Sequence, residues 1–67
     1  MLPYQERIVN ESNELLDKIS KLSTFLKTPM FTDLPREEKV LLKQQHMLML
    51  DYRTILIQRI NRFKDLL

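Results

Sequence analysis

Two tyrosines and two arginines are the residues of this 67-residue chain best suited to binding chemistry. Tyr4 and Arg7 lie near the start of the chain, and Tyr52 and Arg59 lie near its end. Aromatic rings stack on nucleobases, and guanidinium groups donate paired hydrogen bonds to phosphates. The four residues therefore predict a site for a small anionic nucleotide, provided that the fold brings the two ends of the chain together. The alternative for Tyr52 is a core residue whose hydroxyl reaches water.

Apolar residues at helical spacing occur in both halves of the chain, and the segment between the halves contains two prolines. They are Ile8, Leu15, Ile19, Leu22 and Leu26 in the first half, and Leu42, Met49, Tyr52, Leu56, Ile60 and Phe63 in the second. Pro29 disfavours helical geometry at Thr28. The pattern predicts an all-α fold: one domain over residues 1–67, with helix 1 at about 3–27, a turn at 28–34 and helix 2 at about 35–64. The two helices should form an antiparallel hairpin.

A hairpin of this size is expected to need a partner, because chains this short rarely gain more than roughly 3–5 kcal/mol from one core. The chain has no cysteine and a single histidine, so neither a disulfide nor a structural zinc site can supply the missing stability. Helix 2 also carries apolar residues beyond those that helix 1 can cover: Val40, Met47, Leu50 and Ile57. We therefore expect a homo-oligomeric helical bundle, either a dimer or a tetramer.

An antiparallel hairpin that turns near residue 31 would place the acidic start of helix 1 beside the basic end of helix 2. Glu11 would then lie level with Arg53. In the middle of the hairpin Lys18 would lie level with His46 and Lys21 level with Lys43, so that like charges face one another, and an anion between them would relieve the repulsion. For His46, a solvated position on the helix surface is the simpler interpretation.

Composition argues against several classes of function. The chain has no cysteine nucleophile, no second histidine for a metal site and no serine with a histidine within a helical turn, so we expect no enzyme, no metal and no cofactor. The net charge of +2 argues against specific nucleic-acid binding. Because no apolar run is long enough for a transmembrane helix or a secretory signal, we expect a cytoplasmic protein without membrane contact.

The chain resembles a family of very short proteins encoded by tailed phages and prophages, with relatives in crAss-like phages. The resemblance covers Tyr4, Gln5, Arg7, Ile8, Glu11, Leu15, Lys18, Ile19, Lys21, Leu22, Phe25, Phe31, Leu34, Glu38, Leu41, Leu42, Gln45, Met49, Tyr52, Leu56, Arg59, Ile60 and Phe63. In architecture the chain is also similar to the small helical-hairpin sponges with which phages defeat CBASS and Thoeris immunity.

These resemblances imply an immune-evasion sponge in a bacterial host cell, which sequesters a cyclic nucleotide or a cyclic ADP-ribose-type signal without cleaving it. Arg7, Arg59, Lys18 and Lys21 would hold phosphates. Tyr4 and Tyr52 would contact base or ribose, and Glu11 could accept hydrogen bonds from either. The alternative is a small protein–protein interaction module that docks a host or phage protein through the second apolar patch of helix 2.

Overall fold

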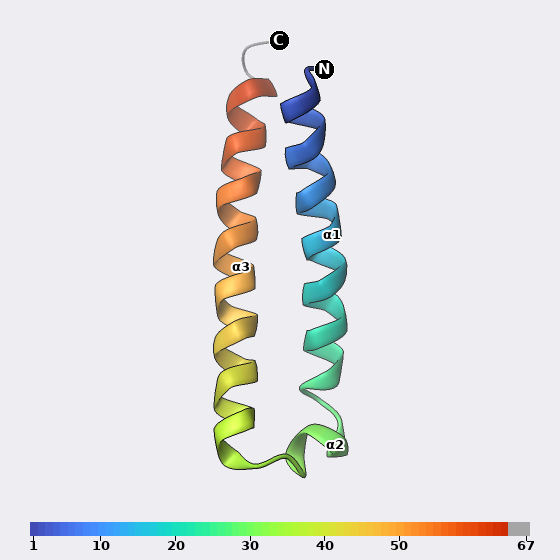
Figure 1. Ribbon diagram of the computed structural model, residues 1–67, viewed down its shortest axis with the longest axis vertical. Helices are drawn as coiled ribbons and strands as arrows, with labels where there is room; N and C mark the ends of the chain where they lie inside the picture. Colours follow the sequence, from blue (N-terminus) through green and yellow to red (C-terminus); the bar gives the residue numbers. More distant parts are fainter. Residues whose placement is uncertain (65–67) are drawn as a thin grey trace.

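In the computed structural model, which describes residues 1–64, the chain forms three helices and no strand over this range. They are α1 (Pro3–Phe25), α2 (Pro29–Thr32) and α3 (Arg36–Lys64). The start of α1 lies beside the end of α3, and α2 lies at the opposite end of the molecule (Figure 1). The prediction of an all-helical fold in which two long helices pack together is confirmed.

The segment expected to be a plain turn contains a short helix. The Thr28 hydroxyl accepts a hydrogen bond from the Phe31 backbone N–H at 3.3 Å, and Pro29 occupies the first helical position. Both are standard features of a helix N-terminus. α2 turns the ring of Phe31 inward, where it meets Phe25 edge to face with 6.2 Å between ring centroids. The buried ring closes this end of the hairpin, and α1 ends at Phe25, slightly earlier than expected.

Gln5 organises the start of α1. Its side-chain oxygen accepts a hydrogen bond from the Leu2 backbone N–H at 2.9 Å, and Gln5 is buried. A helix N-terminus leaves several backbone donors without intrahelical partners. Gln5 satisfies one of them where Leu2, at the capping position, offers no side-chain acceptor.

A buried cluster lies between α1 and α3 in the half of the hairpin that contains the chain ends, and Ile19 and Phe31 are buried further toward the closed end. Ile8, Leu56 and Phe63 form the buried cluster, and Leu56 has no exposed surface at all. Partly buried Val9, Leu15 and Ile60 pack around this cluster. The Phe63 ring also meets Tyr4 edge to face, with 6.4 Å between centroids. These contacts hold the end of α3 against the start of α1, which is what a site built from both ends requires.

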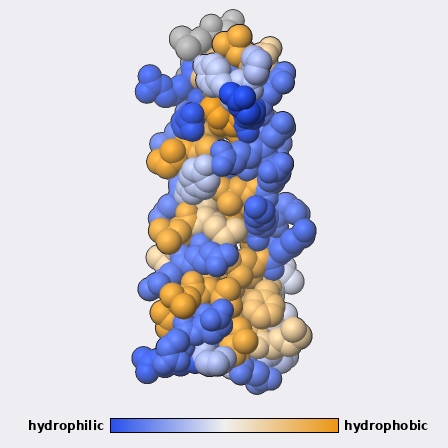
Figure 2. Space-filling view, in the orientation of Figure 1, coloured by the Kyte–Doolittle hydropathy of each residue, from blue (hydrophilic) through white to orange (hydrophobic). Residues whose placement is uncertain are grey.

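Much of the apolar surface of α3 stays exposed. Its exposed apolar side chains are Val40, Leu41, Met47, Leu48, Leu50, Tyr52 and Ile55. Figure 2 shows hydrophobic groups recurring along the α3 side of the molecule, separated by hydrophilic ones. None of the helices over residues 1–64 combines the length and the hydrophobicity that a membrane-spanning helix needs.

Candidate functional site

A pocket of about 350 Å³ lies where the start of α1 meets the end of α3. We call it the open-end pocket, and it is lined by Tyr4, Ile8, Arg59, Arg62 and Phe63. Its size falls within the usual range for small-molecule sites. The apolar residues of the core form part of its wall, while the two guanidinium groups and the Tyr4 ring supply its polar and aromatic groups.

The two arginines of the open-end pocket are available to an anion. In the part of the chain that the structure describes, the one ion pair joins Lys21 and Asp17, so no described carboxylate engages Arg59 or Arg62. The arginines lie three residues apart on α3, a spacing that puts them on neighbouring turns of one helix face. Two guanidinium groups on one face offer paired donors to phosphate oxygens.

Glu11 and Tyr52 join the two helices two turns further into the hairpin. The Tyr52 hydroxyl donates a hydrogen bond to the Glu11 carboxylate at 2.5 Å. This bond raises the pKa of the Tyr52 phenol above its ordinary value, because ionisation would remove the donated proton and place a second negative charge beside the carboxylate. Nearby Arg59 acts in the opposite direction, which places its positive charge within electrostatic reach of this pair.

The raised pKa of Tyr52 predicts how stability depends on alkaline pH. Since the phenol stays protonated to higher pH in the folded state, its contribution is complete below the unfolded pKa of about 10 and is lost as pH rises through the folded value. The chain has two tyrosines, so ultraviolet titration of tyrosinate in a Tyr4→Phe variant reports Tyr52 alone. Adding Glu11→Gln, which removes the carboxylate charge, should lower the pKa of Tyr52. An unchanged titration curve would contradict the interaction.

The pairing across the helices differs by one position from the sequence-based expectation. Glu11 was predicted to lie level with Arg53, but its carboxylate bonds to Tyr52, the residue before. Arg53 is half-buried on α3, and its Nε has no hydrogen-bond partner among residues 1–64. The expected register assumed equal rise in two straight helices, which does not resolve neighbouring residues.

Two members of the predicted cluster of like charges in the middle of the hairpin, Lys21 and Lys43, have local partners. Lys21 Nζ lies 3.0 Å from Asp17 on the preceding turn, and both side chains are exposed. Lys43 Nζ lies over the Phe31 ring, 5.8 Å from its centroid, as a cation–π contact. Lys21 and Lys43 therefore each have a local partner within the single chain.

The structure brings together only part of the predicted site. Tyr4 and Arg59 line the open-end pocket, and Glu11 and Tyr52 meet beyond it. Arg7 is exposed and does not line the pocket. Lys18 and Lys21 lie outside it, since Lys18 is fourteen residues from Tyr4 along α1, or roughly 21 Å at 1.5 Å per residue.

Arg62 is the pocket residue that sequence reasoning missed. It lies in the last turn of α3, where a cation also interacts favourably with the helix dipole. Its spacing of three from Arg59 on the predicted helix is the signal that could have identified it.

Two other hollows have linings less suited to an anion. One, of about 310 Å³ at the closed end, is lined by Phe31, Thr32, Arg36, Lys39, Val40 and Lys43. Two of its three cations already have partners, because Lys39 donates to the Thr32 carbonyl at 3.2 Å and Lys43 lies over Phe31.

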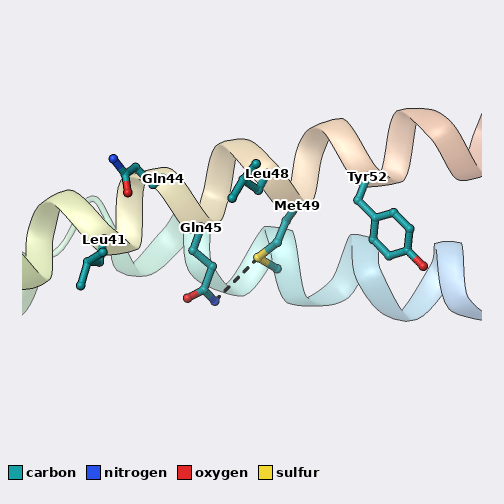
Figure 3. Close-up of a pocket in the computed structure, with 6 residues that line it drawn as sticks. All are labelled: Leu41, Gln44, Gln45, Leu48, Met49 and Tyr52. Carbon is teal, nitrogen blue, oxygen red and sulfur yellow. Dashed lines mark hydrogen bonds between the residues drawn. The ribbon is translucent and has the colours of Figure 1, made fainter.

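The other hollow, of about 530 Å³ on α3, has no cation in its lining. Its walls are Leu41, Gln44, Gln45, Leu48, Met49 and Tyr52. Figure 3 shows that all six side chains come from successive turns of α3, with Tyr52 directed toward α1 and Gln45 bonded to Met49. An apolar hollow on one helix suits another apolar surface better than it suits a phosphate.

Within residues 1–64 no group of three or more histidine, cysteine, aspartate or glutamate side chains is arranged to hold a metal ion. The open-end pocket gathers guanidinium donors and aromatic rings, and the Glu11 carboxylate beyond it is already bonded to the Tyr52 phenol. Such an arrangement suits binding of an anionic, aromatic ligand.

Comparison with known proteins places these features in context. Residues 2–62 match the family model described as Sequestin. The chain is also 39% identical over 64 residues to a 7.5 kDa protein encoded in the denB–rIIB intergenic region of Enterobacteria phage T4, and the match covers 96% of this chain and all of the phage protein. No solved structure matches. The family match includes Ile8 and Leu56 of the buried cluster and every residue that lines the open-end pocket except Phe63, which belongs to both.

Proposed function

This chain belongs to the Sequestin family of short phage proteins, and on that premise we propose that it binds and sequesters a small anionic signalling molecule. The family name itself indicates sequestration. The finer proposal is that the ligand is a cyclic nucleotide or a cyclic ADP-ribose-type signal, such as those of CBASS and Thoeris immunity, held without being cleaved. Assembly of hairpins into a homo-oligomer belongs to the same proposal.

The observation that carries the proposal is the lining of the open-end pocket. Arg59 and Arg62 present donors to phosphate oxygens, and Tyr4 presents an aromatic ring to a base. A cyclic dinucleotide or cyclic ADP-ribose combines both chemical groups in one small molecule. Neither an uncharged metabolite nor a long apolar ligand would use both kinds of group.

The Glu11–Tyr52 pair extends this surface toward the middle of the hairpin. The Tyr52 hydroxyl is engaged by one carboxylate oxygen of Glu11, and the side chains of both residues are exposed. Arg59 lies seven residues beyond Tyr52 on α3, or roughly 10 Å along the helix. A ligand whose phosphate meets Arg59 could therefore place a ribose hydroxyl near Glu11, which has an oxygen left to accept a hydrogen bond.

Binding without cleavage is the proposed mechanism. A protein present in excess over its ligand, with a dissociation constant below the effector's threshold, removes free signal from solution by mass action. Both acids nearest the open end have structural roles, since Glu6 lies in the first turn of α1 and Glu11 bonds to Tyr52. Binding without cleavage needs no general acid or base with a strongly shifted pKa.

A capture-and-release assay tests both parts of the proposal. Purified protein is mixed with cyclic dinucleotides, cyclic trinucleotides and cyclic ADP-ribose isomers, and the solution is passed through an ultrafiltration membrane that retains protein. We expect the filtrate to lose one class of ligand, and heat denaturation of the retained protein to return that ligand intact. A filtrate that keeps every ligand would refute sequestration, and recovery of a hydrolysed product would show catalysis instead.

A second candidate function rests on the other exposed apolar residues of α3. Val40, Met47 and Leu50 remain exposed in the single chain, so the surface that would dock a host or phage protein is open. An amphipathic helix of this kind can lie in a groove of a partner protein. If this apolar surface joins copies of the chain in a homo-oligomer, it is not available to a partner protein. The oligomeric state of the purified chain therefore distinguishes the two functions.

A further inference from the structure

A line of three large apolar side chains runs along α3 outside the hairpin core. Leu41, Leu48 and Ile55 recur at intervals of seven residues, and their side chains are 59%, 67% and 51% exposed. At 3.6 residues per turn, residues seven apart fall within about 20° of each other around a helix. We call these three residues the Leu48 stripe. It borders the apolar hollow of Figure 3, which includes Leu41 and Leu48.

We propose that the Leu48 stripe is the contact between two copies of this chain, with their α3 helices antiparallel and a two-fold axis passing beside Leu48. A symmetric contact of this kind uses the same surface on both copies. Leu48 then meets Leu48 of the second copy, and Leu41 meets Ile55 of the second copy, because each lies seven residues from the axis. This inference does not depend on the identity of any ligand.

The polar residues beside the stripe complement one another in this register. Glu37 and Arg59, each eleven residues from Leu48, lie on the same side of α3 and form two symmetric pairs of opposite charge. Charged residues that flank an apolar contact set the orientation in which helices pair.

A parallel arrangement of the same helices lacks this complementarity. It would place Glu37 opposite Glu37 and Arg59 opposite Arg59. Repulsion between these like charges disfavours the parallel arrangement. The antiparallel register turns both repulsions into attractions. Arg59 borders the open-end pocket as well, and its five N–H donors allow one edge to meet Glu37 while another meets a ligand.

Pairing of two copies also addresses the small size of the hairpin core. From Leu41 to Ile55 the Leu48 stripe spans fourteen residues, roughly 21 Å of a molecule that is 49 Å long. Two hairpins joined in this way form a four-helix bundle, which supplies the core that a single small hairpin lacks.

Cysteine cross-linking tests the register, because the natural chain has no cysteine. We expect Leu48→Cys to give a covalent dimer under mild oxidation, since the two sulfurs meet at the axis. Leu41→Cys is the matched control on the same stripe. Its two copies lie fourteen residues apart, roughly 21 Å, well beyond the 7 Å limit for Cα atoms joined by a disulfide. Cross-linking of both variants would indicate the parallel arrangement and overturn the proposal.

Charge reversal gives a second readout that does not rely on disulfide geometry. In analytical ultracentrifugation the natural chain should sediment as a dimer of the 8.2 kDa protomer. Glu37→Arg should raise the dimer dissociation constant about tenfold, since two symmetric pairs become repulsive. Adding Arg59→Glu should restore it, with helical content checked by circular dichroism. A monomeric natural chain, or a double variant no tighter than the single one, would overturn the proposal.

Discussion

Replacing Arg59 and Arg62 together with alanine is expected to weaken binding of the anionic ligand by at least about 100-fold. A hydrogen bond to a charged group contributes about 1.5–3 kcal/mol, and 1.4 kcal/mol corresponds to a factor of ten in affinity. Both guanidinium groups line the open-end pocket and neither is engaged by a carboxylate among residues 1–64. Isothermal titration with the ligand identified by capture and release measures the loss.

Matched controls distinguish the effect of the pocket arginines on affinity from the effect of overall positive charge. Lys18→Ala together with Lys21→Ala removes the same amount of charge from an exposed part of α1 that lies roughly 21 Å from Tyr4, so affinity should change little. Arg62→Lys keeps the charge but loses the planar pair of donors, so it should bind with intermediate affinity. Equal losses in the arginine and lysine double variants would mean that charge alone, and not the pocket, governs binding.

The second large effect concerns folding. Leu56→Ala is expected to unfold most of the protein at 25 °C, because truncating a fully buried leucine costs about 2–5 kcal/mol. A core of this size supplies only about 3–5 kcal/mol in total. Leu56 contacts the cluster that holds the end of α3 against the start of α1, so its loss also opens the pocket. Circular dichroism at 222 nm and thermal melting measure the change.

Met30→Ala is the control for this prediction. Met30 is a large apolar residue with 68% of its surface exposed, on the short helix at the closed end, and its truncation should leave the melting temperature nearly unchanged. A Leu56→Ala protein that melts at the same temperature as the Met30→Ala protein would contradict the assignment of the core.

Apolar spacing predicted the long helices because packing of one helix on another depends chiefly on that spacing. Ile8, Leu56 and Phe63 were all on the predicted apolar faces, and all are buried. The short helix α2 was not predicted, although its signals, Thr28 as a cap followed by Pro29, are visible in the sequence. They were interpreted as the end of the preceding helix, and a single turn of helix carries no repeating pattern to correct that interpretation.

The site was harder to predict than the fold. Tyr4 and Arg59 could be placed together because the hairpin requires that its ends meet, and the structure lines one pocket with both. A shift of one residue between the two helices decides whether Glu11 meets Arg53 or Tyr52. Apolar spacing does not determine the alignment of the helices to within one residue. Lys18 and Lys21 were predicted ligand residues because like charges face each other in the middle of the hairpin. In the structure Lys21 pairs with Asp17, a local contact that apolar spacing does not reveal.

Native mass spectrometry of the purified protein, alone and with cyclic dinucleotides, cyclic trinucleotides and cyclic ADP-ribose isomers, tests the central claim most directly. The account predicts a discrete oligomer of the 8.2 kDa chain that gains the intact mass of one class of these ligands. The gain should disappear when Arg59 and Arg62 are both alanine. An oligomer whose mass is unchanged by every member of the panel would contradict sequestration of such a signal and would favour the protein-docking function.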